Sequence, residues 1–362
     1  MGKHILMISN VSAGLVSFRY ELIQRLTSEH RVTVLCNDNG RVDQLKGLGC
    51  EVIQFDMDSH GTNPVKELGL MARYLKQLRV IKADIVLTYT IKPNVYAGMA
   101  CAMLKIPYLA NVTGLGTAVE NPGPLQMVTL ALYRAGLRGA QCVFFQNETN
   151  QKFLLDHKVV HGRHELIPGS GVNLSKYNLL DYPQGETVDF LFISRVMKQK
   201  GIDQYLETAK VIRAKYPYTR FHVCGNCDKE YEGVLKQLND DGTIIYHGRI
   251  NDVAGMHRVN CCTIHPTYYP EGMSNVLLES CACGRPIITT DRPGCREIVD
   301  DGVNGFVVKQ KDAADLIAKV EQFLALTWEQ RRDMGLAGRA KVERQFDRQI
   351  VINAYINEVE KV

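Results

Sequence analysis

The sequence predicts an α/β protein made of two doubly wound domains. Its 362 residues, 45% of them hydrophobic and 23% charged, are more than one compact core usually holds, so two domains are expected. Short apolar runs alternate with segments of helical length, which is typical of parallel sheets covered by helices on both faces. The alternation stops in a polar, turn-rich stretch near the middle of the chain and then begins again, which indicates a second domain of the same class.

Residues 1–170 are expected to form the first domain. Its strands are predicted at His4–Ser9, Arg31–Cys36, Glu51–Phe55, Asp84–Tyr89, Pro107–Thr113, Gln141–Gln146 and Glu165–Pro168. Helical spacing or proline start signals occupy the intervals Val16–Ser28, Pro64–Lys82, Pro93–Leu104, Leu125–Arg138 and Glu148–Asp156.

A linker is expected at residues 171–187, and the second domain at residues 188–346. Its strands are predicted at Val188–Ile193, Arg220–Cys224, Thr243–His247, Cys261–His265, Pro286–Thr290 and Gly305–Val308. Its helices are predicted near Ile202–Lys215, Tyr231–Asp240, Asn275–Ala282 and Asp312–Leu326. The tail from Trp328 onward reads as two helices broken near Phe346-Asp347, and we expect residues 347–362 to pack back on the first domain.

The net charge of +4 is distributed unevenly along the chain. Residues 1–175 contain 18 Lys and Arg against 13 Asp and Glu, whereas residues 176–362 contain 25 against 26. A surplus of this size suits an anionic membrane surface or a phosphorylated lipid. It is too weak to argue for nucleic acid, because basic surfaces that bind nucleic acid are usually denser.

The sequence contains no run of about 18 uncharged apolar residues, and its first ten residues lack the arrangement of a signal peptide. We therefore expect a cytoplasmic protein, peripheral on the inner face of the cell membrane, and a monomer or weak dimer. Eleven cysteines are scattered along the chain, many of them inside apolar runs, which is typical of reduced, buried thiols.

The segment Pro270–Glu279 carries the most specific chemistry. Its two carboxylates, Glu271 and Glu279, lie eight positions apart across a loop-to-helix junction, which puts the second about two turns into the helix. Gly272 lets the backbone approach a ligand closely, and the next amides would form a helix N-terminus that holds phosphate oxygens. These amides belong to Met273, Ser274, Asn275 and Val276. A capping carboxylate followed by an exposed helical glutamate would give the same spacing without a ligand.

A basic cluster, Ser194–Gly201, follows the first strand of the second domain. Arg195 can bridge phosphate oxygens and Lys200 can add a point charge, at the edge where an open α/β sheet presents its ligand crevice. Together they could neutralise a leaving diphosphate, which is the main electrostatic task in breaking a glycosyl–phosphate bond. Solvated surface cations are the alternative interpretation.

In combination, these two motifs resemble those of glycosyltransferase family 4, and the resemblance extends over essentially the whole chain. It implies the GT-B fold, in which two Rossmann-like domains face each other across a cleft, and a retaining transfer without metal or other cofactor. Carried over residue by residue, it implies that Glu271 faces the donor sugar and Glu279 the ribose. It also implies that Arg195 and Lys200 hold the diphosphate, so that Glu271, Arg195 and Lys200 are the expected catalytic groups.

Four further donor-site residues are carried over from the resemblance. Gly14 follows the first strand, where many family members have two adjacent glycines but this chain has Ala13-Gly14, and it would let the main chain approach the phosphate. Gly225 matches a glycine-rich turn of the family, although Cys227 departs from that turn. Arg249 and Ile250 are base-pocket candidates, and His247 could frame the base.

Several short segments are similar to a bacterial branch of the family that extends polyprenyl-diphosphate-linked glycans. The acceptor-side candidates carried over from it are Lys92, Asn94, Thr113 and Gly114. Many family members have a histidine where this chain has Thr113, so no catalytic histidine can be transferred, and a plain glycine turn is the alternative. Membrane contact is expected through the cations of Pro64–Lys82 and through the apolar segment Leu125–Arg138.

Three patterns imitate functional sites. Asp56-Met57-Asp58 imitates the metal-binding Asp-x-Asp of another glycosyltransferase fold, but it fits a solvated strand end better. Cys224-Gly225-Asn226-Cys227 has metal-like spacing without a second ligand pair, so no metal is expected there. His265 follows an apolar run and could line the cleft or be a hydrogen-bonded histidine at the edge of the core.

The resemblance thus implies a glycosyltransferase that moves a sugar, an N-acetylhexosamine or a hexose, from a UDP-sugar to a lipid-linked saccharide in glycan, capsule or exopolysaccharide synthesis. A nucleotide-sugar epimerase or a phosphorylase would share the two-domain architecture. A dinucleotide-binding protein is disfavoured because the first strand–helix turn lacks Gly-x-Gly-x-x-Gly.

Overall fold

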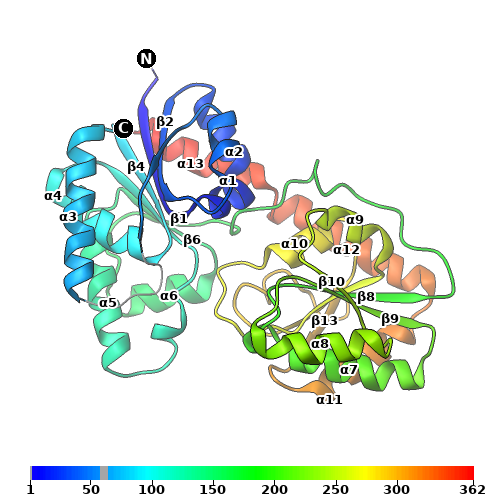
Figure 1. Ribbon diagram of the computed structural model, residues 1–362. Coiled ribbons are helices and arrows are strands. Elements are labelled where there is room, and N and C mark those ends of the chain that lie inside the picture. Colours follow the sequence, from blue (N-terminus) through cyan, green and yellow to red (C-terminus); the bar gives the residue numbers. More distant parts are fainter. Residues whose placement is uncertain (1, 58–63) are drawn as a thin grey trace. The chain divides into compact units, whose positions relative to one another are not determined.

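The computed structural model describes residues 2–57 and 64–362, and these divide into two compact units (Figure 1). The first unit comprises the described residues up to Ser170 together with Gln349–Val362, and the second comprises Gly171–Arg348. Residues 171–187, expected to be a linker, belong to the second unit. Asp58, the second carboxylate of the imitated metal motif, lies outside the described residues.

The first unit is built on a parallel sheet of seven strands in the order β3-β2-β1-β4-β5-β6-β7. The strands are β1 His4–Val11, β2 Arg31–Asn37, β3 Glu51–Gln54, β4 Ile85–Tyr89, β5 Tyr108–Val112, β6 Cys142–Phe145 and β7 His164–Leu166. Separate apolar clusters pack on its two faces, as the nearly continuous hydrophobic strands predict. The predicted α/β class is confirmed.

Helices cover both faces of this sheet. They are α1 Ser12–Thr27, α2 Val42–Gly47, α3 Pro64–Ile81, α4 Gly98–Leu104, α5 Pro124–Leu137, α6 Glu148–Asp156 and α13 Arg348–Glu360. A π-helical turn, η1 Pro93–Ala97, precedes α4, and a 3₁₀ turn, η2 Thr117–Val119, precedes α5. The helix predicted over Pro93–Leu104 is therefore two kinds of helix joined end to end.

The closing helix α13 completes the core of the first unit. Val351, Ile352 and Val359 are buried in one of the two apolar clusters. The ring of Tyr355 lies 4.5 Å from that of Phe144, and its hydroxyl accepts a hydrogen bond of 2.6 Å from Asn111 Nδ2. A segment at the end of the chain thus contributes side chains to the centre of the unit that contains its start.

The second unit is a parallel sheet of six strands in the order β10-β9-β8-β11-β12-β13. The strands are β8 Val188–Ile193, β9 Thr219–Cys224, β10 Ile245–Gly248, β11 Cys262–His265, β12 Ile287–Thr290 and β13 Gly305–Val308. The helices are α7 Ile202–Lys215, α8 Lys229–Asp240, α9 Val253–Val259, α10 Asn275–Ala282, α11 Ala313–Leu324 and α12 Trp328–Gln345, with a 3₁₀ turn, η3 Lys198–Lys200, before α7. The helix α9 is not predicted by the sequence pattern.

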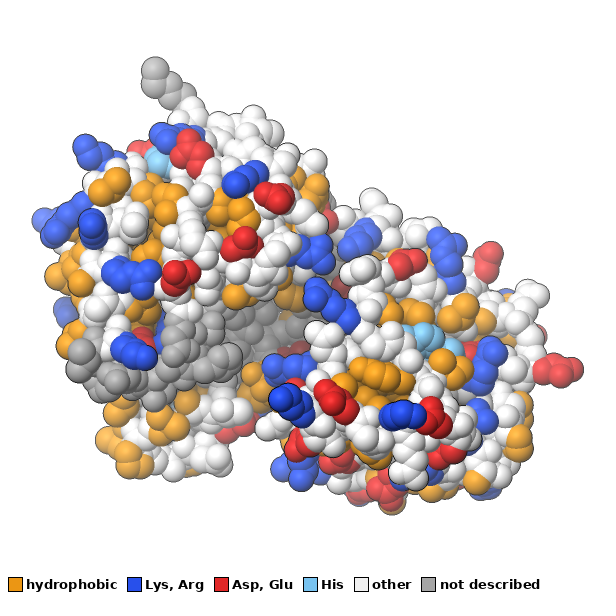
Figure 2. All heavy atoms as spheres, in the orientation of Figure 1, with side chains coloured by type: hydrophobic (Ala, Val, Ile, Leu, Met, Phe, Trp, Pro, Cys, Tyr) orange, Lys and Arg blue, Asp and Glu red, His pale blue; other side chains and the backbone are white. Residues whose placement is uncertain are grey.

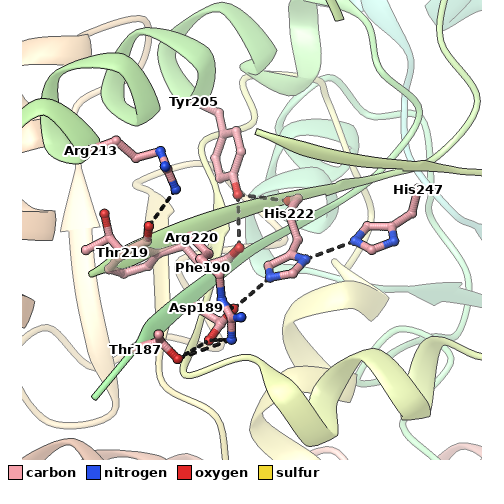
Figure 3. A network of polar contacts seen from close by, with 9 residues as sticks. All are labelled: Thr187, Asp189, Phe190, Tyr205, Arg213, Thr219, Arg220, His222 and His247. Atoms are coloured by element: carbon pink, nitrogen blue, oxygen red, sulfur yellow. Dashed lines mark hydrogen bonds and ion pairs between the residues drawn. The ribbon is translucent and has the colours of Figure 1, made fainter. Parts of the chain in front are cut away.

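A polar network ties β8, β9 and β10 together (Figure 3). Asp189 is buried at the start of β8 and accepts hydrogen bonds from Arg220 Nε at 2.7 Å and His222 Nε2 at 2.8 Å. Burial would raise the pKa of Asp189, but the bonds from His222 and Arg220 lower it below its usual value. The buried carboxylate is thus ionised and paired, which satisfies the usual condition for burying a charge.

Candidate active site

The second unit has a topological switch point between β8 and β11. The chain winds from β8 toward β10 in one direction and from β11 toward β13 in the other, so the loops after β8 and β11 diverge at adjacent carboxyl ends. Ligands of open α/β sheets bind at such a point. The loop after β8 carries Arg195 and Lys200, and the loop after β11 carries Glu271 and Gly272.

Gly201 allows these two loops to touch. It has φ of +79°, and a Cβ at this position would lie 2.1 Å from the carbonyl oxygen of Pro266. The backbone amide of Tyr268 also donates to the carbonyl of Gln199 at 2.9 Å. Only glycine fits both the left-handed conformation and the close approach, so Gly201 fixes the position of Lys200 relative to the loop after β11.

Lys200 and Glu271 meet directly at this point. The Lys200 ammonium forms an ion pair with Glu271 Oε1, and both side chains are only 14% exposed. His265 Nε2 and Thr267 Oγ1 each lie 3.4 Å from the same oxygen. Burial alone would raise the pKa of Glu271, but the bond from His265 and the charge of Lys200 hold it at about 2. Glu271 is therefore an ionised acceptor throughout the neutral range.

Glu279 lies on α10 in a different environment. Burial raises its pKa to about 7, although a hydrogen bond from the Tyr177 hydroxyl and the charges of Lys176 and Arg348 oppose this shift. The two glutamates of the motif thus differ in protonation near neutral pH. The eight-residue spacing alone gives no sign of this difference.

The start of α10 is bounded by the loop after β12. Gly272 and Met273 are buried, and a Cβ on Gly294 would lie 2.7 Å from the Gly272 carbonyl oxygen. The Ser274 amide donates to the Gly294 carbonyl at 2.8 Å, so this amide, expected in a phosphate cradle, is already used. The partly exposed Asn275 and Val276 form the first turn, where the helix dipole favours an anion.

Arg195 and Gly225 are near the switch point but do not join the Lys200–Glu271 contact. Arg195 is exposed, and its Nε lies 2.9 Å from Met197 Sδ. Gly225 has φ of +141°, and a Cβ there would lie 1.8 Å from the Ser194 carbonyl oxygen. Packing against the loop after β8 therefore already requires this glycine, independently of any phosphate.

The base-pocket candidates follow β10 at the edge of the sheet. Arg249 is exposed and Ile250 is half-buried. His247, just before them, lies with its Nε2 2.9 Å from His222 Nδ1, in the network anchored by Asp189 (Figure 3). Its exposed ring stacks on that of His222, and one of its nitrogens is already in contact with that residue.

In the first unit, the corresponding switch point lies between β1 and β4. Gly14 is in the first turn of α1, after β1, and a Cβ there would meet nothing nearer than a Val11 methyl group at 3.9 Å. Packing of the described residues does not require glycine here. We therefore interpret Gly14 as leaving space for a ligand to approach the main chain closely.

The acceptor-side candidates of the first unit separate into two groups. Lys92 Nζ forms a largely buried ion pair with Glu67 at 2.6 Å, whereas Thr113 and Gly114 are half-buried just after β5. Asn94 is fully buried and bonds Thr88 Oγ1 and the Asn111 carbonyl, each at 2.7 Å. The Asn94 side chain thus supports the ends of β4 and β5.

The sequence pattern gives little weight to three side chains near the two glutamates. His265 and Thr267 contact Glu271, and Tyr177 is close enough to Glu279 to influence its pKa. The sequence does contain a signal for His265, because this residue ends a predicted strand, β11, at the switch point where ligands bind. Tyr177 comes from the segment expected to be a linker, and no spacing relates it to Glu279.

Among the described residues, one group has the spacing of metal ligands, and it lies away from either switch point. Cys142 Sγ and carboxylate oxygens of Glu165 and Glu358 lie within 4.8 Å of one another. Arg163 Nε donates to Glu358 Oε1 at 2.8 Å, and Lys361 contacts the same oxygen. These cations already neutralise Glu358, so we interpret the group as a polar contact that joins α13 to the β6–β7 edge of the sheet. All eleven cysteines are free thiols.

Comparison with known proteins identifies both units. Residues 4–147 match the family described as glycosyl transferase 4-like, and residues 183–341 match glycosyl transferases group 1. An N,N'-diacetylbacillosaminyl-diphospho-undecaprenol alpha-1,3-N-acetylgalactosaminyltransferase from Campylobacter jejuni is 25% identical over 98% of both chains. The capsular polysaccharide biosynthesis glycosyltransferase CapM from Staphylococcus aureus is 27% identical over 44% of this chain and 42% of its own.

Solved structures agree on the architecture. Alr3699/HepE from Anabaena, in complex with UDP and glucose, superposes with a TM-score of 0.80 at 16% identity over 99% of both chains. A sucrose-phosphate synthase from Thermosynechococcus elongatus gives 0.76 at 19% identity, covering 99% of this chain and 98% of its own. These similarities show the fold, and the family matches show the class of enzyme. The chain therefore belongs to the family 4, group 1 glycosyltransferases and has the GT-B fold.

Proposed function

We propose that this enzyme is a retaining transferase that moves a sugar from a UDP-sugar to a lipid-linked saccharide. The observation that carries the proposal is the meeting of Lys200 and Glu271 at the switch point of the second unit, beside the start of α10. One cation, one ionised carboxylate and a helix N-terminus are the groups that a sugar diphosphate needs. Lys200 and the first-turn amides would hold the diphosphate, and Glu271 would accept hydrogen bonds from sugar hydroxyls.

The choice of substrates rests on relatives. The Campylobacter jejuni relative is named for transfer of N-acetylgalactosamine to a diphospho-undecaprenol-linked sugar, and its similarity covers the whole chain. The Anabaena structure contains UDP and glucose. By analogy, we infer a UDP-linked N-acetylhexosamine or hexose as donor and a polyprenyl-diphosphate-linked saccharide as acceptor.

The chemistry we propose requires no covalent intermediate on the protein. The acceptor hydroxyl would attack the anomeric carbon from the face of the leaving group, the glycosyl–phosphate bond would break, and a phosphate oxygen would take the proton. Glu271 is paired with Lys200 and would position the sugar and stabilise positive charge at the anomeric carbon. Arg195 and Lys200 would neutralise the leaving diphosphate, so we expect transfer to persist in a chelator.

The acceptor would use the first unit, near Lys92, Thr113 and Gly114. Thr113 and Gly114 follow β5 with partly exposed atoms that a saccharide could approach. Lys92 is paired with Glu67, so an acceptor phosphate would have to compete with that carboxylate.

We also propose that the first unit contacts an anionic membrane surface from the cytoplasmic side. No helix among the described residues is long and apolar enough to cross a bilayer. At the start of α5, Leu125, Met127 and Val128 are 57–70% exposed, and Figure 2 shows hydrophobic side chains at the lower end of this unit. The exposed cations of α3 and the residue that follows it could add attraction to anionic lipid: Lys66, Arg73, Lys76, Arg79 and Lys82.

Vesicle binding tests the membrane contact. Wild type should co-sediment with vesicles containing anionic lipid, and Met127→Glu should reduce the bound fraction several-fold because a charge would enter the interface. The control is Glu replacing Val303, which is 57% exposed in the second unit, and this variant should bind like wild type. Equal binding of all three proteins would contradict the proposal.

Thermal-shift screening against UDP-sugars and GDP-sugars tests the donor, because a ligand that binds only the folded state raises its melting temperature. The best stabiliser is then incubated with and without an undecaprenyl-diphosphate-linked saccharide. Release of UDP with a lengthened glycan is expected. A changed sugar in the absence of acceptor would indicate epimerisation and contradict transfer.

A further inference from the structure

His265 is held at the end of β11, in the middle of the second sheet. This strand pairs with β8 on one side and with β12 on the other, where His265 lies beside Thr289. The Thr289 hydroxyl donates to the His265 carbonyl at 2.8 Å, and the next residue, Pro266, has a restricted φ. The His265 side chain is only 2% exposed. Its ring therefore has a fixed position relative to the loop that follows β11.

The His265 ring reaches Glu271 through one of its nitrogens. Nε2 lies 3.4 Å from Glu271 Oε1. An ionised carboxylate only accepts hydrogen bonds, so Nε2 carries a proton and donates it to this contact. Nδ1 is buried and has no hydrogen-bond partner among the residues that the structure describes. The polar contact that the described part of the chain offers this ring is thus the one with Glu271.

Three side chains donate to Glu271 Oε1, and a bound sugar diphosphate would affect them differently. The Lys200 ammonium is at the end of a flexible stem and, in the proposed function, binds the diphosphate. The Thr267 hydroxyl has one proton, for which the Gln199 carbonyl, at 3.3 Å, competes with Glu271, at 3.4 Å. No second acceptor among the described residues competes for the His265 proton. His265 is therefore the side chain that can keep its hydrogen bond to Glu271 when Lys200 leaves.

We propose that His265 is a positioning residue for sugar transfer, which holds the Glu271 carboxylate in the orientation that accepts hydrogen bonds from the sugar hydroxyls. The inference rests on the proposed function, in which Glu271 binds the sugar. A ring that only filled space at the edge of the core could be replaced by any side chain of similar size. A positioning ring requires an N–H group at the place of Nε2.

The kinetics of two amide variants test this role. The side-chain nitrogen of glutamine reaches as far from the backbone as Nε2, whereas that of asparagine reaches only as far as Nδ1. His265→Gln should therefore stay within about threefold of the wild-type kcat, whereas His265→Asn should lower kcat about tenfold, the size of a lost hydrogen bond to a charged group. UDP release is measured with an undecaprenyl-diphosphate-linked saccharide and UDP-N-acetylgalactosamine or UDP-glucose, whichever wild type uses faster.

Thr263→Val is the matched control, because it removes buried hydrogen bonds from the same strand without touching Glu271. Thr263 Oγ1 accepts from Ser280 Oγ at 2.8 Å and from Asn260 Nδ2 at 3.2 Å. This variant should melt at a lower temperature than wild type and keep the wild-type kcat. A loss of stability in β11 is thereby separated from a loss of positioning.

A double-mutant cycle with Glu271 completes the test. His265→Asn should weaken binding of the same UDP-sugar about fivefold in calorimetric titration, but less than twofold once Glu271→Ala has removed the carboxylate. His265→Leu, which has no polar group, gives the same comparison if His265→Asn does not fold.

Three results would overturn the positioning role: equal losses in the Gln and Asn variants, wild-type rates in the Asn variant, or an unchanged effect in the Glu271→Ala background. Each of them leaves the proposed function intact as long as wild type transfers sugar. Absence of transfer by wild type would overturn both.

Discussion

At the level of single residues, Lys200 and Glu271 form the centre of the candidate site. The contact joins two loops 71 positions apart in sequence, and Glu271 also receives His265 and Thr267. Removing these two charges from water costs free energy, and their mutual attraction offsets that cost only partly. A bound sugar diphosphate would replace this ion pair, because its phosphate oxygens would bind Lys200 while its sugar hydroxyls donate hydrogen bonds to Glu271.

Removal of either charge should reduce turnover sharply. Lys200→Ala and Glu271→Ala should each lower kcat by about 10²–10³, because preorganised charge at a developing diphosphate contributes on that scale. Initial rates of UDP release in the presence of acceptor measure the effect. Lys198→Ala, which removes an exposed cation from the same turn, should keep near-wild-type rates, and near-wild-type transfer by the other two variants would contradict the assignment.

Glu279 should make stability depend on pH. Its pKa is raised from about 4.5 to about 7 in the folded protein, so the folded state binds its proton more tightly than the unfolded state. Its contribution to stability is then fully present below pH 4.5 and is lost as the pH rises through 7. Glu279→Gln should melt higher than wild type at pH 8.5 and about equally at pH 5, while binding UDP more weakly. Equal melting temperatures at pH 8.5 would show that burial of this carboxylate has no cost.

The sequence predicts the charged residues of the site better than their partners. Glu271 and Lys200 could be found because each lies next to a glycine in a loop that follows a strand, and because their two motifs together resemble those of one family. His265, Thr267 and Tyr177 could not be given roles, because contact with a glutamate depends on rotamers and on loops brought together by the sheet. The buried bonds of Asn94 to Thr88 and Asn111 could not be predicted for the same reason, because its local sequence does not show that it packs behind β4 and β5.

At the level of secondary-structure elements, glycine decides how closely the loops approach. Gly201→Ala should cost about 1–3 kcal/mol of stability, because alanine would be strained at φ of +79° and would clash with Pro266, and it should abolish UDP binding. Gly242→Ala is a matched control with φ of +77° and nothing within 4 Å of its Cβ. It should cost only about 1 kcal/mol and bind UDP normally. Urea unfolding and UDP titration measure both effects, and equal losses in the two variants would contradict the close-approach argument.

The elements themselves could largely be predicted, with instructive exceptions. The bounds of α7 and α10 agree with the predictions, since their apolar spacing and flanking glycines or loops are local signals. Helix α1 begins four residues before the prediction, because the Asn39 side chain accepts from the Ser12 hydroxyl and the Ala13 amide. A cap supplied from 26 positions away leaves no trace in the local pattern. The seven-residue α9 is too short to show a helical period.

At the level of the whole molecule, the chain leaves the first unit after Ser170 and returns to it at Gln349. The outgoing and returning segments run side by side within the second unit, where Val172 and Asp347 form a parallel bridge. The alternation of strands and helices predicted two such units. The exact crossing point could not be predicted, because it depends on packing such as that of Gly171, whose added Cβ would lie 2.5 Å from Arg348 Cα.

The returning helix should be essential for the stability of the first unit. Tyr355→Ala should destabilise it by about 3–5 kcal/mol, because it removes a fully buried ring from the core. Tyr355→Phe keeps the ring and loses only the bond with Asn111, and should cost about 1 kcal/mol. Hydrogen exchange of the backbone amides of β4, β5 and β6 measures the stability of the first unit separately from that of the second. Equal exchange in both variants and wild type would mean that α13 is dispensable.

If the second unit holds a nucleoside diphosphate between the loops after β8 and β11, calorimetric titration with UDP will detect the binding. Wild type and Lys198→Ala should bind alike, whereas Lys200→Ala should bind at least tenfold more weakly, with a smaller dependence on salt. Identical affinities for all three proteins, or no binding of UDP by wild type, would contradict a donor site at Lys200.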